Sequence, residues 1–277
     1  MSVFVNPFTD FGFKRIFGQE DTKHILIGFL NALFEGEFVV QDLVYRDKEQ
    51  LSEQKGERGV IFDIFCTTTE GYHFILEMQN KNQAHFEDRA LYYVARSIVG
   101  QGRKGADWVY EYDAVIGIFF MNFVHEVLLG EFRSDFGIRN LKSGKPQELQ
   151  VLTDKLRMVF LQMPQFTKTL EECETKLDKW TYIIKNMETL NEMPWREQEE
   201  LFDEISKVAS VAALSEEERN RYEDALRNYR DNIDVRNADI HEERIRMARL
   251  MIADNCTSEI ISKYTSLSLD EIEKLRR

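Results

Sequence analysis

The sequence predicts an α/β domain over roughly residues 1–190, followed by an all-helical region over 191–277. The first half alternates short runs of β-branched and aromatic residues with segments of helical periodicity. Its most apolar segment, 114–123, is a nearly continuous hydrophobic run, which is typical of a central strand covered on both faces. From Thr169 onward, helical patterns follow one another. These observations indicate a mixed sheet flanked by helices, with a helical C-terminal region.

The individual elements follow from periodicity and turn residues. Apolar residues at three- and four-residue spacing predict helices over 22–34 and 88–101, and charged repeats over 224–254 predict a solvated helix. The last 20 residues predict two short amphipathic helices around a Ser-Leu-Ser turn. Apolar or alternating runs bounded by polar segments predict strands near 38–45, 59–68, 72–79, 114–122, 132–139 and 156–163.

Composition limits the class of protein. Hydrophobic residues make up 43% of the 277 residues, which is enough for a packed core, and no stretch approaches 18 consecutive apolar residues. The first residues lack the basic-then-apolar layout of a signal peptide. Three widely spaced cysteines match no zinc-binding spacing. We therefore expect a protein of the reducing cytoplasm, with no membrane partner.

The net charge of −13 argues against a polyanionic partner, because a negative surface repels phosphate. Acidic runs lie mainly in the second half, so the average charge says little about the first. If the chain binds nucleic acid, its basic residues must be concentrated beside the site. We expect that patch to include Lys14, Arg15, Lys81 and Arg89.

Two acidic residues interrupt adjacent apolar strands. Asp63 lies in a Val-Ile-Phe-Asp-Ile-Phe run and Glu77 in Phe-Ile-Leu-Glu-Met-Gln. A carboxylate in such surroundings costs several kcal/mol unless it is paired, hydrogen-bonded or metal-bound. The period of two places Gln79 on the face of Glu77. From the residues alone two interpretations stay open: a metal site for phosphate chemistry, or satisfied polar groups at solvated strand ends.

The length of the hairpin loop decides whether these acids meet. A two-residue loop at Glu70 and Gly71 would set Asp63 opposite Met78, with the two carboxylates on opposite faces. A loop of three residues, Thr69 to Gly71, sets Asp63 opposite Glu77 instead. Gly71 is then the position at which such loops require a left-handed conformation. We expect the three-residue loop, a positive φ at Gly71 and both carboxylates on one face.

The ordered motifs resemble a known family. The first half is similar to the PD-(D/E)xK superfamily of metal-dependent nucleases, and more closely to its Rpn-type branch of recombination-promoting nucleases and transposases. The likeness covers roughly the first 190 residues, and the C-terminal SEIISKYTSLSLDEIEKL resembles the helical tail common in that branch. The stretches that carry the resemblance are TDFGFKRIFG at 9–18, FDI at 62–64, LEMQ at 76–79 and DRALYY at 88–93, followed by Gln101.

The resemblance implies a restriction-endonuclease-like fold and a metal-dependent DNA endonuclease, with a possible link to recombination or mobile elements. Asp63 and Glu77 would be catalytic and would hold Mg²⁺ or Mn²⁺, and we expect the Met78 backbone carbonyl to join them. Gln79 would occupy the position of the superfamily's usual lysine, although the Rpn-type branch shares the glutamine. Glutamine orients by hydrogen bonds but is neither a cation nor an acid–base group at neutral pH.

Two classes of function therefore remain. One is an endonuclease that acts on DNA, either as a monomer or as a homo-oligomer. The other is a catalytically silent binding or assembly module that keeps the fold, favoured by the net charge and by Gln79. Among further residues, Asp10 is expected to cap the first helix and pair with Lys14 four residues on. Arg89 and Tyr93 lie four apart on the helix after the hairpin, so they can face the same site, and packing of Tyr93 against the sheet is the alternative.

Overall fold

The computed structural model describes residues 2–46, 62–103, 109–128, 130–139 and 151–276. The chain divides into two compact units, Met1–Tyr222 and Glu223–Arg277. The boundary expected near residue 190 differs from this division. The reason is that α5 (Glu200–Val208), which lies beyond residue 190, packs together with α4 (Lys176–Asn186) on the helical layer of the first unit.

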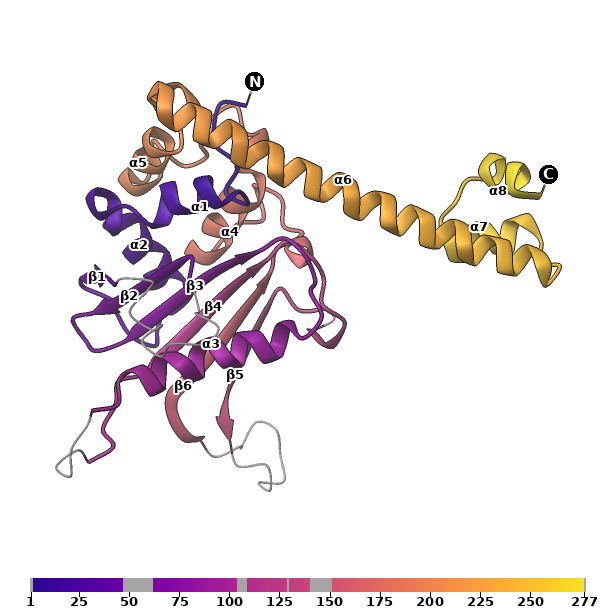
Figure 1. Cartoon of the computed structure of the whole chain (residues 1–277). Helices are drawn as coiled ribbons and strands as arrows, with labels where there is room; N and C mark the ends of the chain where they lie inside the picture. The colour runs from indigo at the N-terminus through magenta and orange to yellow at the C-terminus, as the bar shows by residue number, and fades with distance from the viewer. Residues whose placement is uncertain (1, 47–61, 104–108, 129, 140–150, 277) are drawn as a thin grey trace. The chain divides into compact units, whose positions relative to one another are not determined.

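In the described part of the chain, the first unit is built around a mixed six-stranded sheet with the order β1-β2-β3-β4-β6-β5 (Figure 1). The pairs β3–β4 and β4–β6 are parallel, and the other neighbours are antiparallel. All six predicted strands are present, although residues 59–61 lie outside the described ranges. The strands are β1 (Leu43–Tyr45), β2 (Ile64–Thr68), β3 (His73–Gln79), β4 (Val115–Met121), β5 (Arg133–Arg139) and β6 (Val151–Gln162).

Strand β1 is shorter than the predicted 38–45 because the preceding residues bond elsewhere. The Asn31 side chain accepts from the Val40 amide at 2.7 Å and donates to the Val40 carbonyl at 3.0 Å. Phe38 stacks between Phe34 and Tyr72. The backbone at Val40 is thereby tied to a helix rather than to a neighbouring strand.

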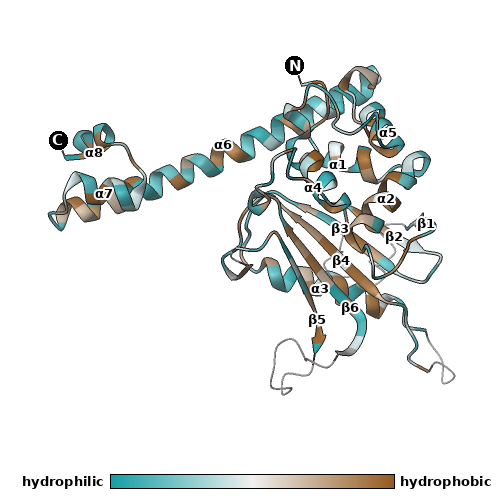
Figure 2. Cartoon of the chain, turned by 180° about the vertical axis from the view of Figure 1, so that it is seen from behind, coloured by the Kyte–Doolittle hydropathy of each residue, from teal (hydrophilic) through white to brown (hydrophobic). Residues whose placement is uncertain are grey.

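Helices cover both faces of the sheet. On one face, α3 (Phe86–Gly100) packs Phe86 and Val94 into a core with Val115 and Phe119 of β4. On the other face, helices α1 (Asp10–Phe17), α2 (Lys23–Leu33) and α4 gather around Phe120, whose ring lies 5.3 Å from Phe13 and from Phe29. The apolar colour of the central strands in Figure 2 reflects this double cover. The mixed sheet flanked by helices is therefore confirmed.

Helix α3 lies close to the sheet at Gly117. A Cβ atom at this position would lie 2.8 Å from Cγ2 of Val94 and 2.8 Å from the Phe119 ring. Neither neighbour is the far end of a long flexible side chain, so any larger residue would have to displace the packing. Glycine thus permits the close contact between β4 and the middle of α3.

The first helix is capped by Thr9, not by Asp10 as the sequence indicated. The Thr9 hydroxyl accepts from the Gly12 amide at 2.9 Å and donates to the Asn6 carbonyl at 2.7 Å. Asp10 is instead the first helical residue, where a negative charge interacts favourably with the helix dipole. The expected pair between Asp10 and Lys14 is present.

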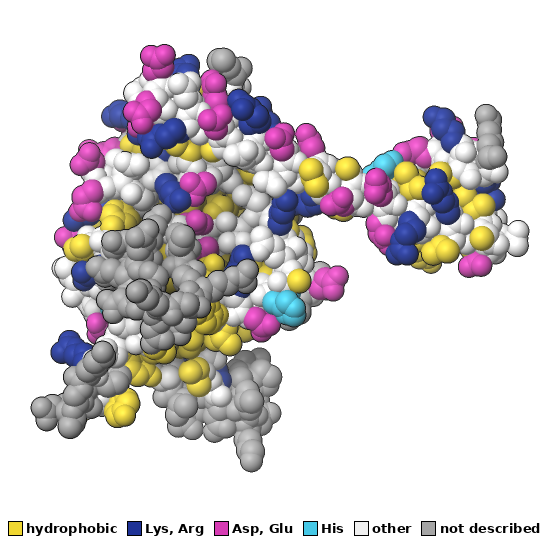
Figure 3. Space-filling view, in the orientation of Figure 1, with side chains coloured by type: hydrophobic (Ala, Val, Ile, Leu, Met, Phe, Trp, Pro, Cys, Tyr) yellow, Lys and Arg dark blue, Asp and Glu magenta, His cyan; other side chains and the backbone are white. Residues whose placement is uncertain are grey.

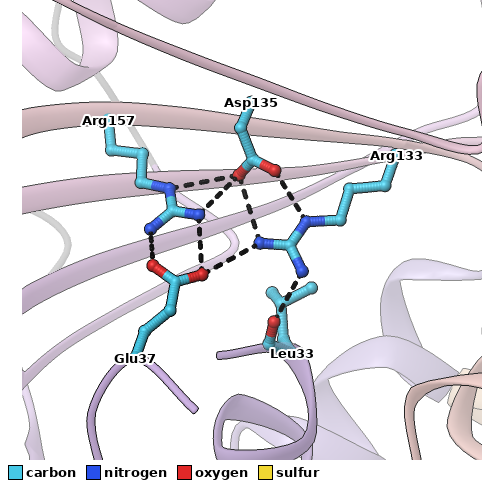
Figure 4. Close-up of polar contacts among 5 residues, drawn as sticks. All are labelled: Leu33, Glu37, Arg133, Asp135 and Arg157. Carbon is cyan, nitrogen blue, oxygen red and sulfur yellow. Dashed lines mark hydrogen bonds and ion pairs between the residues drawn. The ribbon is translucent and has the colours of Figure 1, made fainter. Parts of the chain in front are cut away.

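An ionic cluster of Glu37, Arg133, Asp135 and Arg157 ties the edge of the sheet to the region after α2 (Figure 4). Arg133 contacts Asp135 at 2.7 Å and donates to the Leu33 carbonyl at 2.7 Å. Arg157 contacts Asp135 at 3.0 Å and also pairs with Glu37, whose pKa this pairing lowers despite partial burial. Both guanidinium groups lie over the Phe34 ring, so charge and packing act together.

The second unit consists of the C-terminal part of α6 (Glu216–Ala253) with α7 (Ser258–Thr265) and α8 (Leu269–Arg276). Its core contains Ala248, Ile261, Leu267 and Ile272. Helix α6 is predominantly hydrophilic (Figure 2), as its charged repeats predicted. In the described part of the chain, no helix combines the length and apolar character needed to cross a bilayer. Short 3₁₀ segments lie at Glu20–Thr22, Glu126–Leu128, Met163–Gln165, Met187–Thr189 and Val211–Ala213.

The β2–β3 hairpin has the predicted register. Ile64 pairs with Leu76 and Thr67 with His73, and the Thr68 amide donates to the Tyr72 carbonyl at 2.9 Å. The loop therefore contains the three residues Thr69 to Gly71, and Gly71 has a φ of +88°. Extended by one residue beyond Ile64, this register sets Asp63 opposite Glu77.

Replacing Gly71 by Val should lower the free energy of unfolding by about 1–2 kcal/mol, because a β-branched residue is strained at positive φ. A new Cβ would also meet the Asp113 carboxylate at 3.3 Å. Urea denaturation followed by circular dichroism measures the change. Gly137→Ala is the matched control, because its Cβ would meet only an ordinary contact of 3.5 Å to the Leu156 carbonyl. Equal stability of the two variants would contradict the role of Gly71.

Candidate active site

Asp63 and Glu77 lie side by side at the open end of the hairpin, joined by reciprocal hydrogen bonds. The Asp63 amide donates to Oε1 of Glu77 at 3.1 Å, and the Met78 amide donates to Oδ2 of Asp63 at 2.8 Å. The Glu77 carboxylate thus accepts from the backbone of Asp63, and the Asp63 carboxylate accepts from the residue that follows Glu77. The two acids occupy the same end of neighbouring strands, as the three-residue loop requires.

Both acids belong to the face of the sheet that α3 covers. Phe65 and Ile75, which share the strand parity of Asp63 and Glu77, are part of the core under α3. Gln79 follows on the same face, and its amide donates to Oε2 of Glu77 at 3.3 Å. Since β3 runs parallel to β4 and β6, the site lies at the carboxyl ends of the parallel strands. Open α/β sheets commonly bind ligands at this edge.

Glu77 is 4% exposed, so its environment disfavours charge. Burial raises the pKa of Glu77 to about 8, and the neighbouring Asp63 carboxylate adds to the effect. The Asp63 amide, the Arg89 guanidinium and the Gln79 amide act in the opposite direction. Among the described residues, Glu77 forms no ion pair with a basic side chain. The buried carboxylate therefore depends on hydrogen bonds and on charges at a distance.

Arg89 on α3 reaches the site through Gln79. Its Nη2 donates to Oε1 of Gln79, and its Nη1 donates to Oε1 of Gln83 at 2.6 Å. The guanidinium carbon lies 5.9 Å from the ring centroids of Phe86 and Tyr93. Burial raises the pKa of Tyr93, and the charge of Glu77 contributes. Arg89 therefore reaches the site, and Tyr93 packs against Phe62 in the core beside it.

The sequence did not indicate Gln83 or the two asparagines behind the site. The Asn122 amide donates to the Gln79 carbonyl at 2.8 Å, and its side chain donates to Oδ1 of Asn80 at 3.3 Å. Asn80 in turn donates to the Phe8 carbonyl at 2.7 Å. Asn80 and Asn122 each follow directly after an apolar strand, and this position in the sequence could have indicated polar residues at the same edge of the sheet. Gln83 lies in a polar loop without any periodic pattern.

The other basic residues of the expected patch lie in different surroundings. Arg15 pairs with Glu218 at 2.5 Å and donates to the Val208 carbonyl at 3.2 Å, so its charge is used within the fold. Lys14 pairs with Asp10. Lys81 is half-buried two residues after Gln79. Figure 3 shows basic and acidic side chains interspersed over the visible face. Of the four, Arg89 is the residue for which the structure gives a contact with Gln79 of the site.

The oxygen donors of the site fit a hard divalent cation. Carboxylate and carbonyl oxygens are preferred by Mg²⁺ and Mn²⁺, and Mg²⁺ is often held by only one or two carboxylates plus waters and substrate phosphate. The N–H and C=O of a strand residue point to the same side, so the Met78 carbonyl faces the strand edge of Asp63. A cation there would offset the charge of the buried pair. No group of three or more His, Cys, Asp or Glu within the described ranges forms a metal site alone.

Comparison with known proteins identifies the family and is consistent with the fold. A family model described as PD-(D/E)XK nuclease family transposase matches residues 7–238. Because this match spans most of the 277 residues, the chain belongs to that family. The resemblance indicated by the sequence motifs is thereby confirmed. No curated protein and no solved structure matches the chain.

The pKa of Glu77 gives a pH dependence of stability in the metal-free protein. The folded pKa, about 8, exceeds the reference value of 4.5, so the folded state retains a proton that the unfolded state releases between these values. The free energy of unfolding should therefore fall as pH rises through this window, by up to about 1.4 kcal/mol per pH unit. Glu77→Gln should remove this component of the slope.

The measurement is urea denaturation with a chelator at several values between pH 5 and pH 8.5. Glu20→Gln, an exposed acid whose side chain is 66% accessible, is the control and should keep the wild-type slope. Identical pH profiles for wild type and Glu77→Gln would show that Glu77 is not protonated in the folded state.

Proposed function

We propose that this protein is a divalent-metal-dependent endonuclease that hydrolyses phosphodiester bonds of DNA. The observation that carries the proposal is the adjacent pair of Asp63 and Glu77, one of them almost fully buried, at the carboxyl ends of parallel strands. Such a pair is costly unless it serves to bind a cation. Membership of a nuclease-type family supports the same reaction class.

In this proposal Asp63, Glu77 and the Met78 carbonyl would hold Mg²⁺ or Mn²⁺. A bound ion would supply polarisation of the phosphoryl oxygen and a lowered pKa of the attacking water. The backbone amides of Asp63 and Met78 fix the two carboxylates in register. Gln79 orients Glu77 by donating to Oε2. Lys81, which follows Gln79 by two residues, is the basic residue that we assign to phosphate contact, and Lys14 is a second candidate.

A catalytically silent binding module is the second candidate. The net charge of −13 opposes a polyanion, and Gln79 lacks the charge of the lysine that the wider superfamily carries. Engagement of Arg15 with Glu218 further reduces the available positive charge. The two candidates differ in one measurable property, since only the enzyme loses a metal-dependent activity when Asp63 is changed.

The test is nicking of supercoiled plasmid with Mg²⁺ or Mn²⁺. Asp63→Asn should reduce the rate more than about a hundredfold, since even indirect partners of metal ligands commonly cost 10- to 100-fold. Asp154→Asn is the matched control, because Asp154 is exposed near the opposite end of the parallel strands. Its activity should equal that of the wild type.

Metal binding is measured separately by calorimetry and by thermal melting with Mn²⁺. Binding to the folded state alone raises the melting temperature, and Asp63→Asn should abolish both the heat and the shift. A wild-type protein that binds no Mn²⁺ and nicks no plasmid would favour the silent module. Activity that survives in Asp63→Asn would remove the proposed site.

A further inference from the structure

The site has a cation that the strand motif does not encode. Arg89 donates from Nη2 to Gln79 and from Nη1 to Gln83, and it lies beside the rings of Phe86 and Tyr93. Among the described residues it forms no ion pair with a carboxylate. Arg89 is a half-buried cation held by two neutral amides and two aromatic rings. Its charge is therefore not neutralised by a direct partner.

The hydrogen bonds assign a direction to the Gln79 side chain. A guanidinium can only donate, so the Gln79 atom that meets Arg89 must be the amide oxygen. The amide nitrogen then points toward Glu77, where it donates to Oε2 at 3.3 Å. Arg89, Gln79 and Glu77 thus form a chain in which each member fixes the next. Without Arg89, this series of hydrogen bonds would no longer fix the orientation of the Gln79 amide, and its oxygen and nitrogen could exchange places by rotation.

We infer that Arg89 is a positioning residue that supplies, from α3 and through Gln79, the positive charge that a lysine on β3 would supply directly. The inference deepens the proposed function and rests on it. The polarised Gln79 amide holds the Glu77 carboxylate toward the Asp63 side, and the guanidinium places a cation behind that amide. Gln79 is then one half of a two-residue replacement for lysine.

Two features of the structure favour this assignment over simple packing. Arg89 has the rigid fork of donors needed to bond Gln79 and Gln83 together, and a lysine has no second donor in that geometry. The rings on either side of Arg89 stabilise a cation specifically. A residue needed only for packing could be a methionine, which has similar length and no charge.

The first test compares Arg89→Met with the wild type. The plasmid-nicking kcat should fall about tenfold to a hundredfold, the effect of one lost charge-assisted hydrogen bond, with KM for DNA changed less than about threefold. Mn²⁺ affinity by calorimetry should be unchanged or tighter, because a repelling cation has been removed. Arg103→Met removes the same charge from an exposed position after α3, and it should behave as wild type.

The second test moves the charge back to the strand. Gln79→Lys alone should be poorly active, because the new ammonium would face Arg89. The double variant Gln79→Lys with Arg89→Met should recover at least about tenfold over Arg89→Met. Arg89→Lys should keep more activity than Arg89→Met, since it retains the charge. All variants are checked by thermal melting before the kinetics are compared.

The outcomes separate the two levels of the proposal. Weaker Mn²⁺ binding and a large drop in melting temperature for Arg89→Met, with no recovery in the double variant, would make Arg89 a structural residue and overturn the inference. A raised KM with unchanged kcat would do the same, because it would assign Arg89 to DNA binding. If the wild type itself neither binds Mn²⁺ nor nicks DNA, the proposed function fails first.

Discussion

The register of the β2–β3 hairpin is the constraint on which the rest of the site depends. Side chains alternate between faces along a strand, so a shift of one residue would send Asp63 to the face opposite Glu77. The three-residue loop and the left-handed Gly71 fix the register. The Asp63 amide and the Met78 amide then meet the opposing carboxylates. The loop, which contributes no ligand, determines whether the two acids can act together.

Placing a carboxylate pair at the edge of an aromatic core is costly, and the fold offsets the cost only in part. The core beneath α3 contains Phe62, Phe65 and Phe86. Glu77 is itself buried at this face of the sheet. Backbone amides satisfy oxygens of both acids, but amides do not neutralise charge. Burial accordingly raises the pKa of Glu77. A site of this kind is poised to take up positive charge, whether a proton, a metal ion or a neighbouring guanidinium.

Sequence reasoning succeeded where a local rule decides the outcome. The apolar runs located all six strands, and the composition of the loop at 69–71 gave the hairpin register. It failed where distant segments compete for the same group. The Asn31 side chain hydrogen-bonds the backbone amide and carbonyl of Val40, and β1 is therefore shorter than predicted. Arg15 finds Glu218, which lies 203 residues away. The contact between Arg89 and Gln79 depends on how α3 lies on the sheet, which no spacing in the chain specifies.

Gly117 links the packing of the sheet interior to the geometry of the candidate site. Because a single added carbon would collide with Val94, the clearance between β4 and α3 is set by the absence of a side chain. Arg89 lies five residues before Val94 on the same helix, so a rise of the helix at its middle would carry the guanidinium with it. A variant at this core position would look like a packing defect, yet its first symptom would be a mispositioned cation at the site. The absence of a side chain at Gly117 on β4 thereby helps to set the position of the Arg89 guanidinium on α3.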